Sequence, residues 1–454
     1  MLIWLGHRLI WVVFRPILGI FSDFKVLGSN HLHKTPRPVI IVSNHESHFD
    51  PFLISAATRI TANIMPIRFF TRDIFFEQFF FKYVLKALGA FPGRIGAGIE
   101  TASLQPGIYL KAGKTIGIFP EWCFPDEPDI SRMQSIAPLV SQQSRRPILP
   151  VFLYGIQGLY WRKIFARRKK IIVSFASPIC PKDGESLGNY TERVQVGMSE
   201  AKVRCIKYLE KESTKFWTSY AGFYKYLELA EPYQRMKTTI TSLLPEKVYG
   251  RWLDVGTGSG AMVDVLLTKQ SGLKEIIATD FSQEMLTIAE ERFRGNPIVK
   301  TESLDLSRKH PYRTNYFDGV VANLVLPYVM HHEGVVGASA LRRALLEIRR
   351  VLKPGGTLIW STPKRGVNFI FVAIASWRSF GDRKHPEYRS YAWQILKHAM
   401  RIQEWGRREI YNFLSLSELE EMLHEIGFAN ITLRSSLAGQ AYVISCQKAK
   451  DRDE

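Results

Sequence analysis

Residues 43–50 read Ser-Asn-His-Glu-Ser-His-Phe-Asp and place a histidine, His45, five positions before an aspartate, Asp50. The preceding run at 38–42, Pro-Val-Ile-Ile-Val, is apolar and predicts a buried strand. Pro51 follows at once and suits the first turn of a helix, while Asp50 suits the cap before it. We therefore expect His45 to lie in a strand-to-helix turn, where functional side chains are often presented by a rigid frame.

Two interpretations of this stretch are open on its own residues. A histidine with a nearby carboxylate is the minimal general base, because the carboxylate fixes the ring tautomer and stabilises the imidazolium. The alternative is a capped helix start with a histidine on the surface. The segments that follow decide between the two.

Three later segments of this half carry side chains suited to binding a polar substrate. Residues 88–94 are rich in turn formers and end in Arg94, and arginine is suited to bidentate phosphate binding. Residues 115–122 read as a strand ended by a proline, with the carboxylate of Glu121 at its end. Residues 146–155 form another apolar, proline-bearing strand.

In this order, the segments resemble the four motifs of the glycerolipid acyltransferase family, which includes lysophosphatidate acyltransferases. The resemblance covers about residues 25–215 and predicts an α/β acyltransferase domain. The matching positions are Asn44, His45 and Asp50 for the first motif, Arg94 for the second, Phe119, Pro120 and Glu121 for the third, and Ile148-Leu149-Pro150-Val151 for the fourth.

The resemblance implies direct acyl transfer similar to that of a 1-acylglycerol-3-phosphate O-acyltransferase. His45 would take the proton of an acceptor hydroxyl as it attacks the thioester of acyl-CoA or acyl carrier protein, with Asp50 orienting the ring. Arg94 and Glu121 would bind the acceptor, Arg94 facing a phosphate. Trp122 stands where the family has glycine. We therefore expect an acceptor other than an ordinary lysophosphatidate.

The first residues, 1–22, are strongly apolar but are interrupted by a histidine and by Arg8 and Arg15. We expect a helix at 1–24 that lies in the membrane interface, with Trp4 and Trp11 as anchors and the arginines toward the headgroups. Burial as an ordinary first helix is the alternative.

Composition predicts two or three domains with anionic partners. The chain has 454 residues, 46% of them hydrophobic, and a formal net charge of +19. About +13 of that charge falls in residues 1–230. A basic cluster at 161–170 favours lipid headgroups, with a nucleic-acid patch or a solvated loop as alternatives. A phenylalanine-rich run at 74–85 is typical of a core helix, or of an acyl-chain contact. The four cysteines show no metal-ligand spacing and fit a reducing compartment.

Residues 191–215 are a charged stretch that predicts a helix closing the first domain, and residues 224–244 predict another helix. The second half then shows its own pattern at residues 251–260, Arg-Trp-Leu-Asp-Val-Gly-Thr-Gly-Ser-Gly. This is a strand that feeds a glycine-rich turn and a helix, so the backbone can approach a ligand closely. A second strand ends in Asp280 about 20 residues beyond the turn, the position for clamping ribose hydroxyls. Asp305 follows a third short strand.

Strands and helices then alternate, which predicts a mostly parallel sheet with helices on both faces. The set resembles a class I S-adenosylmethionine-dependent methyltransferase over roughly residues 220–448, with a Rossmann-like seven-stranded fold; a dehydrogenase is the competing interpretation. The resemblance puts Asp280 on the ribose and Asp305 near the adenine amino group. The cofactor-binding residues it implies are Asp254, Gly256, Gly258, Gly260, Asp280, Asp305 and Asn323.

Residues after the fourth strand are where acceptors are often contacted in this fold. Asn323, Tyr328, His331 and His332 lie there, and His331 or His332 is a candidate base. The histidine pair has no further ligand nearby, so we expect no metal. An insert at 369–405, rich in Trp, Tyr, Arg and His, is expected to cover the substrate pocket.

We therefore expect a membrane-interface helix at 1–24, an acyltransferase-like domain at 25–215 and a methyltransferase domain at 216–454. The expected function is bifunctional lipid biosynthesis at the cytoplasmic face of a membrane, with peripheral or monotopic attachment, membrane lipids as partners and no nucleic acid. One alternative is a methyltransferase that carries a catalytically inactive, lipid-binding acyltransferase-like module. A nucleic-acid methyltransferase is the other.

Overall fold

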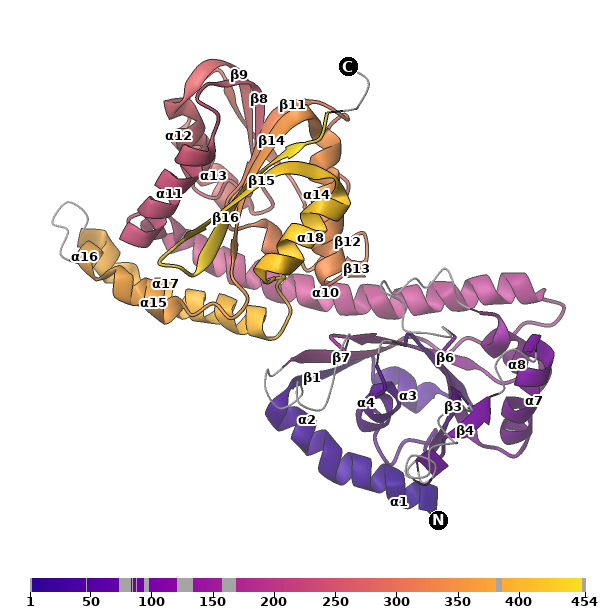
Figure 1. Cartoon of the computed structure of the whole chain (residues 1–454). Coiled ribbons are helices and arrows are strands. Elements are labelled where there is room, and N and C mark those ends of the chain that lie inside the picture. Colours follow the sequence, from indigo (N-terminus) through magenta and orange to yellow (C-terminus); the bar gives the residue numbers. More distant parts are fainter. Residues whose placement is uncertain are drawn as a thin grey trace. The chain divides into compact units, whose positions relative to one another are not determined.

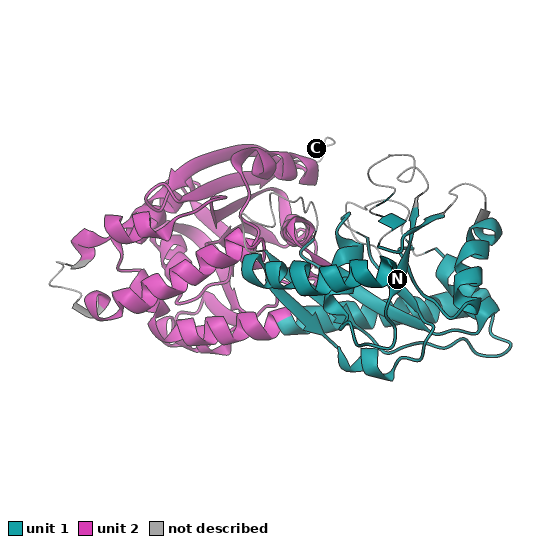
Figure 2. Cartoon of the chain, turned by 90° about the horizontal axis from the view of Figure 1, so that it is seen from below, with its two compact units in different colours: residues 1–208 teal, residues 209–454 magenta. Residues whose placement is uncertain are grey.

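The structure is a computed structural model. It describes residues 2–45, 47–72, 83, 85–86, 88–93, 98–120, 134–156, 169–380 and 386–450. The chain forms two compact units, residues 1–208 and residues 209–454 (Figure 2). The division falls inside one long helix, α10 (Leu187–Leu227), which the sequence suggested only as a shorter helix at 191–215.

Unit 1 is built on a seven-stranded sheet whose neighbours are parallel except for β6 and β7. Alternate residues of its central strand enter two separate cores: Val39 and Ile41 join one, Ile40 and Val42 the other. Both faces of the sheet are therefore covered, as the continuous apolar runs predicted. The strands, in sheet order, are β1 (Asp23–Leu27), β7 (Lys170–Phe175), β6 (Ile148–Tyr154), β2 (Ile40–Ser43), β5 (Thr115–Ile118), β3 (Ile67–Arg72) and β4 (Phe91–Gly93).

The chain of unit 1 begins with a helical rod made of α1 (Leu2–Leu9), a π-helical stretch η1 (Ile10–Phe14) and α2 (Arg15–Phe21), which runs along one side of the unit (Figure 1). The other described helices of this unit, besides the start of α10, are α3 (Asn30–Lys34), α4 (Asp50–Ala57), α7 (Gly98–Lys111) and α8 (Ile136–Ser144).

One face of the rod is tied to the unit. His7 is buried with Nε2 2.9 Å from the carbonyl of Ile67, and Arg15 donates to the carbonyl of Ala56. The expectation that Arg15 turns toward headgroups is therefore wrong, because its guanidinium satisfies a backbone acceptor of α4. By length and composition the segment Leu2–Phe21 could cross a membrane. Its exposed large apolar side chains are Leu2, Trp4, Leu5, Leu9, Val12, Val13 and Ile20.

Unit 2 has a second seven-stranded sheet, and the Rossmann-like fold expected for this half is confirmed. All neighbouring strands are parallel except the last two pairs, which are antiparallel. The strands, in sheet order, are β10 (Val299–Ser303), β9 (Gln270–Asp280), β8 (Val248–Val255), β11 (Phe317–Ala322), β14 (Leu352–Pro363), β16 (Ala441–Lys448) and β15 (Phe428–Ser436).

Helices cover this sheet, and a small hairpin stands beside it. The predicted helix at 224–244 is in fact broken, because α10 ends at Leu227 and the next helix starts at Glu231, where Pro232 suits the first turn. The remaining elements are α11 (Glu231–Leu243), α12 (Ala261–Thr268), α13 (Gln283–Arg292), η3 (Leu326–Tyr328), β12 (His331–His332), β13 (Val335–Val336), α14 (Ala338–Val351), α15 (Phe369–Ala375), α16 (Trp377–Phe380), α17 (Pro386–Arg407) and α18 (Leu416–Ile426).

Candidate functional sites

The first site is a histidine–carboxylate pair at the end of β2. Nδ1 of His45 lies 2.7 Å from Oδ2 of Asp50. Asp50 is fully buried, whereas the His45 side chain keeps 23% of its surface exposed. Because Nδ1 is engaged by the carboxylate, Nε2 is the ring nitrogen that would exchange a proton with a substrate. This is the arrangement that a general base needs.

Asp50 is held from a second direction by Ser47. The Ser47 hydroxyl donates to Oδ1 at 2.7 Å, and its backbone N–H lies 3.2 Å from Oδ2. The prediction that Asp50 caps α4 is wrong, since the helix begins at Asp50 itself and Phe49 occupies the cap position without a side-chain bond. The carboxylate therefore serves the turn that carries His45.

The neighbours of His45 fix where its ring lies. The Phe119 ring, at the end of β5, stacks on the imidazole with centroids 4.4 Å apart and planes at 22°. Asn44 is buried and clamps the backbone of Leu153 in β6: its Nδ2 donates to the Leu153 carbonyl at 3.0 Å, and its Oδ1 accepts from the Leu153 N–H at 2.8 Å. Three strands thus hold the turn in place.

The other predicted acyltransferase positions lie outside the described residues: Arg94, Glu121 and Trp122. So do most of the phenylalanine-rich run and residues 161–168 of the basic cluster. The last two lysines of that cluster, Lys169 and Lys170, are buried, and Lys170 lies 3.3 Å from the Asp23 carboxylate. These two lysines therefore do not belong to a surface that could meet headgroups.

The second site is the glycine-rich turn between β8 and α12. The carboxylate of Asp280, at the end of β9, accepts the backbone N–H of Gly258 at 3.0 Å and that of Ser282 at 3.0 Å. Asp254 is fully buried at the end of β8, with Oδ2 2.6 Å from the Thr257 hydroxyl. Two carboxylates from adjacent strands therefore flank the turn.

The turn requires glycine both for its backbone φ angles and because neighbouring side chains leave no room for a Cβ. Gly256 and Gly258 have φ of 66° and 54°, the left-handed region that side chains avoid. A Cβ on Gly256 would collide with Val325, and one on Gly258 would come within 3.0 Å of the Tyr224 ring. A side chain at either position would therefore have to displace Val325 or the Tyr224 ring that packs against the turn.

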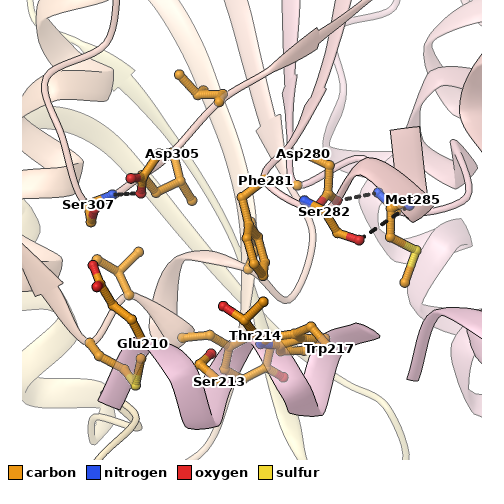
Figure 3. A pocket seen from close by; sticks show the side chains of 18 of the residues that line it. Glu210, Ser213, Thr214, Trp217, Asp280, Phe281, Ser282, Met285, Asp305 and Ser307 are labelled. Carbon is orange, nitrogen blue, oxygen red and sulfur yellow. Dashed lines mark hydrogen bonds between the residues drawn. The ribbon is translucent and has the colours of Figure 1, made fainter. Parts of the chain in front are cut away.

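A cavity of about 390 Å³ opens beside this turn. Gly256, Gly258, Asp280, Asp305 and Asn323 of the predicted set line it. Figure 3 shows Asp280, Ser282 and Met285 on one side, Asp305 and Ser307 on the other, and side chains of α10 across from both. Those α10 side chains are Glu210, Ser213, Thr214 and Trp217.

Gly260 and Asp254, also predicted to bind the cofactor, do not line the cavity. Gly260 caps α12 with φ of 87°, and a Cβ there would collide with Phe293, so its role is packing. Asp254 does not line the cavity, and its Oδ1 is buried without a hydrogen-bond partner. Burial raises the pKa of Asp254 to about 7 and also raises the pKa of Asp280.

Neutral polar side chains form part of the cavity wall. Asn323 donates to the Tyr233 hydroxyl at 2.9 Å and accepts from the Ser361 hydroxyl at 2.6 Å. Burial raises the pKa of Tyr224 and Tyr328, which also line the cavity, well above the usual value. These phenols therefore stay protonated and act as hydrogen-bonding groups.

Only one of the two candidate histidines lines the cavity. His331 lines the cavity, and its Nε2 lies 2.9 Å from Oε1 of Glu210. His332 is buried and is not among the lining residues, and burial lowers its pKa. The hairpin β12–β13 thus turns one histidine toward the cavity and the next one away.

Comparison with known proteins agrees with this division. An acyltransferase family model matches residues 23–152, and a methyltransferase-domain model matches residues 253–360. The chain is an acyltransferase domain followed by a methyltransferase domain. It therefore combines two transferase domains.

Curated relatives cover the methyltransferase domain. A demethylmenaquinone methyltransferase of Staphylococcus aureus (strain JH9) is 29% identical over 209 residues, which is 44% of this chain and 76% of that protein. The ubiquinone/menaquinone biosynthesis C-methyltransferase UbiE of Cupriavidus taiwanensis is 26% identical over 187 residues, 38% of this chain and 72% of that protein. Among solved structures, a SAM-dependent methyltransferase from Aquifex aeolicus shares 17% identity with a TM-score of 0.33, over 49% of this chain and 92% of that chain.

Sequence reasoning missed the α10 wall of the methyltransferase cavity. The sequence predicts only that residues 191–215 close the acyltransferase domain, whereas Glu210, Thr214, Trp217 and Tyr224 line the methyltransferase cavity. Their spacing of three, four and seven residues places them on one helical face, and that periodicity was the available signal. Glu228, which accepts the Ser259 hydroxyl, continues this support beyond the helix.

Proposed function

We propose that the chain is a bifunctional enzyme of lipid biosynthesis. The acyltransferase domain moves an acyl group from acyl-CoA or acyl carrier protein to a hydroxyl of a lysolipid or related lipid. The methyltransferase domain moves a methyl group from S-adenosylmethionine to a lipid headgroup or a related small acceptor. The observation that carries the proposal is the His45–Asp50 pair, 2.7 Å apart, inside an acyltransferase domain.

In the acyl step, Nε2 of His45 takes the proton of the acceptor hydroxyl while its oxygen bonds to the thioester carbon. The carbon–sulfur bond breaks as the tetrahedral intermediate collapses, and the departing thiolate takes the proton back from the imidazolium. Asp50 stabilises that imidazolium and keeps the ring in one tautomer. General base catalysis of this kind contributes about 10²–10⁴-fold to the rate.

Acceptor binding is assigned to Arg94 and Glu121, with Arg94 on a phosphate. Trp122, in the position of a family glycine, favours an acceptor other than lysophosphatidate.

In the methyl step the residues of the chain bind the cofactor, orient the acceptor and exclude water from both. The carboxylate of Asp280 suits the two ribose hydroxyls, and Asp305 suits the adenine amino group. S-adenosylmethionine, when bound, supplies a methyl group on a sulfonium, and in-line displacement needs mainly positioning. The neutral phenols and Asn323 in the cavity wall favour an acceptor that is already nucleophilic, such as an amine. His331 with Glu210 is the candidate proton acceptor.

The helical rod at 2–21 is assigned to the membrane surface. One face is tied to the acyltransferase domain through His7 and Arg15, while large apolar side chains cover the other face. A helix held along its length in this way suits insertion parallel to the bilayer plane. We assign the enzyme to the cytoplasmic face of a membrane as a peripheral or monotopic protein.

Lipid mass spectrometry tests the proposal. Cells with and without the chain are grown with isotope-labelled methionine, and their lipid extracts are compared. The proposal expects lipid species that gain the methyl label, and species that gain an acyl chain, only when the chain is present. Identical lipid profiles, together with label in nucleic acid, would favour the nucleic-acid alternative instead.

A further inference from the structure

A second cavity adjoins the cofactor cavity of the methyltransferase domain. Its volume is about 80 Å³. Four side chains belong to the walls of both cavities: Trp217, Tyr224, Leu324 and Tyr328. The rest of its wall is almost entirely apolar and aromatic. Those residues include Tyr220, Phe369, Val372, Tyr388, Ile395 and Ala399.

The outer wall of this cavity is a helical layer made of α15 and α17, which lie side by side (Figure 1). Aromatic pairs fasten α17 to the part of α10 in the same unit. Tyr226 stacks on Tyr391 with centroids 4.4 Å apart, and Tyr220 stacks on His398 at 5.0 Å. Each helix of this layer therefore has an inner face that borders the cavity.

The outer face of the same layer is also apolar, although it faces solvent. On α15, Phe371 is 55% and Ile374 is 61% exposed, and Ile370 joins them. Trp377 in α16 and Trp393 in α17 are 67% and 72% exposed. Single exposed apolar side chains are ordinary, but five large ones on three consecutive helices mark a contact surface.

Positive charge stands among these apolar residues. Arg378 follows Trp377 and is 67% exposed, while Arg389 and Lys397 are exposed four residues to either side of Trp393. Tryptophan with basic neighbours is the composition that favours the interface of an anionic bilayer.

We propose that α15–α17 is a lid that docks on anionic lipid, and that the methyl acceptor carries an apolar body which passes from the bilayer into the 80 Å³ cavity. The volume admits only a short segment of hydrocarbon chain, so the rest of the acceptor stays under the lid or in the lipid. Its nucleophilic atom then lies at the shared wall of Tyr224 and Tyr328, beside the cofactor turn. This inference rests on the proposed methyl transfer to a lipid and narrows its substrate class.

Docking is tested with a reporter on the lid of the full chain. Ile374→Cys is labelled with an environment-sensitive fluorophore in a Cys123→Ser, Cys180→Ser background, and Tyr249→Cys, 61% exposed on β8, is the matched control. Vesicles of phosphatidylethanolamine and phosphatidylglycerol are then added. A several-fold rise in emission at 374, with none at 249, is expected. Unchanged emission at 374, while the protein sediments with the vesicles, would overturn the proposed docking. Emission at 374 that rises with protein concentration in the absence of vesicles would also overturn it, because the surface would then bind a second copy of the chain.

Entry into the cavity is tested by filling it. Ala399→Phe adds a ring on the inner face of α17, and Glu420→Phe adds the same ring on an exposed position of α18, outside the proposed docking surface. Transfer of label from S-adenosylmethionine to vesicles made from extracted lipids of cells lacking the chain is measured. Ala399→Phe is expected to lower transfer more than tenfold, with cofactor affinity within about twofold by calorimetry, while Glu420→Phe keeps wild-type transfer.

The two possible failures are distinguishable. If the unmodified chain labels no lipid, the proposed function fails. If it labels a lipid and Ala399→Phe labels it equally well, the proposed function stands and the cavity is not the acceptor site.

Discussion

Buried carboxylates lie at the candidate site of each domain, and their hydrogen-bond partners differ. Asp50 is fixed by Ser47 and turned toward His45. Asp280 is fixed by backbone N–H groups of the glycine turn, and Asp254 is buried with one oxygen unpaired. The residue types were readable from the sequence. Their hydrogen-bond partners were not, because those lie several residues away and depend on the turn geometry.

Replacing Asp50 by asparagine tests the role of the pair. Asp50→Asn keeps the size of the side chain but removes the charge that stabilises an imidazolium, so acyl transfer is expected to fall by about 10²–10⁴-fold. Methyl transfer is expected to stay unchanged. The measurement follows labelled acyl-CoA into lipid. An acyl-transfer rate within twofold of the wild type would count against His45 as base.

Removing the carboxylate of Asp280 is expected to weaken S-adenosylmethionine binding. Loss of a charged hydrogen-bond acceptor costs about 1.5–3 kcal/mol, which corresponds to about 10–150-fold in the dissociation constant. Titration calorimetry on Asp280→Ala measures the dissociation constant. Glu421→Ala, which removes a carboxylate from an exposed part of α18, is the control. Unchanged affinity in Asp280→Ala would remove this residue from the cofactor site.

The buried Asp254 predicts a pH dependence. Burial raises its pKa to about 7, so the folded domain binds this proton more tightly than the unfolded chain does. The resulting stabilisation is complete below the unfolded pKa of about 3.9 and is lost as the pH rises to about 7. A cofactor with a sulfonium and an ammonium favours the ionised carboxylate. Its affinity is therefore expected to rise about tenfold between pH 6 and pH 7.5.

Calorimetry at the two pH values checks this expectation. Asp254→Asn removes the titrating proton and is expected to flatten the dependence. Equal affinity of the unmodified chain at both pH values would show that Asp254 does not ionise when the cofactor binds.

At the scale of elements, the strands and the turns between them were the most predictable part. Apolar runs such as 38–42 and 115–118 became fully buried strands, and the glycine turn follows β8 as expected. The length of helix α10 was not predictable, because its charged and polar residues continue across the boundary between the two units. The break at 228–230 was also missed, since only Pro232 marks it in the sequence.

The helical rod gives a prediction at this scale. Leu5→Asp with Val12→Asp places two charges on its exposed face without touching His7 or Arg15. The free energy of unfolding is expected to change by less than about 0.5 kcal/mol, because both positions are exposed. The protein is expected to move from the membrane to the soluble fraction on sedimentation. Tyr249→Asp, an exposed apolar position of the methyltransferase domain, is the control. Membrane retention of the double variant would assign the rod to packing alone.

At the scale of the whole molecule, two α/β domains in one chain were foreseeable from two independent sets of motifs. The sheet orders and the antiparallel pairs β6–β7 and β14–β16 were not, because strand pairing depends on contacts far apart in the sequence. The cavity of about 80 Å³ had no signal of its own, since the same aromatic residues would also suit a closed core. Two separate sites predict two activities that mutation can separate.

The most direct test is a double-label assay in one reaction. The chain is given acyl-CoA labelled in the acyl group, S-adenosylmethionine labelled in the methyl group, and vesicles of lipids extracted from cells that lack the chain. His45→Ala and Asp280→Ala are compared with the unmodified protein. We predict that His45→Ala loses the acyl label while the methyl label still enters lipid, and that Asp280→Ala shows the converse. Acyl label that persists in His45→Ala would contradict the account.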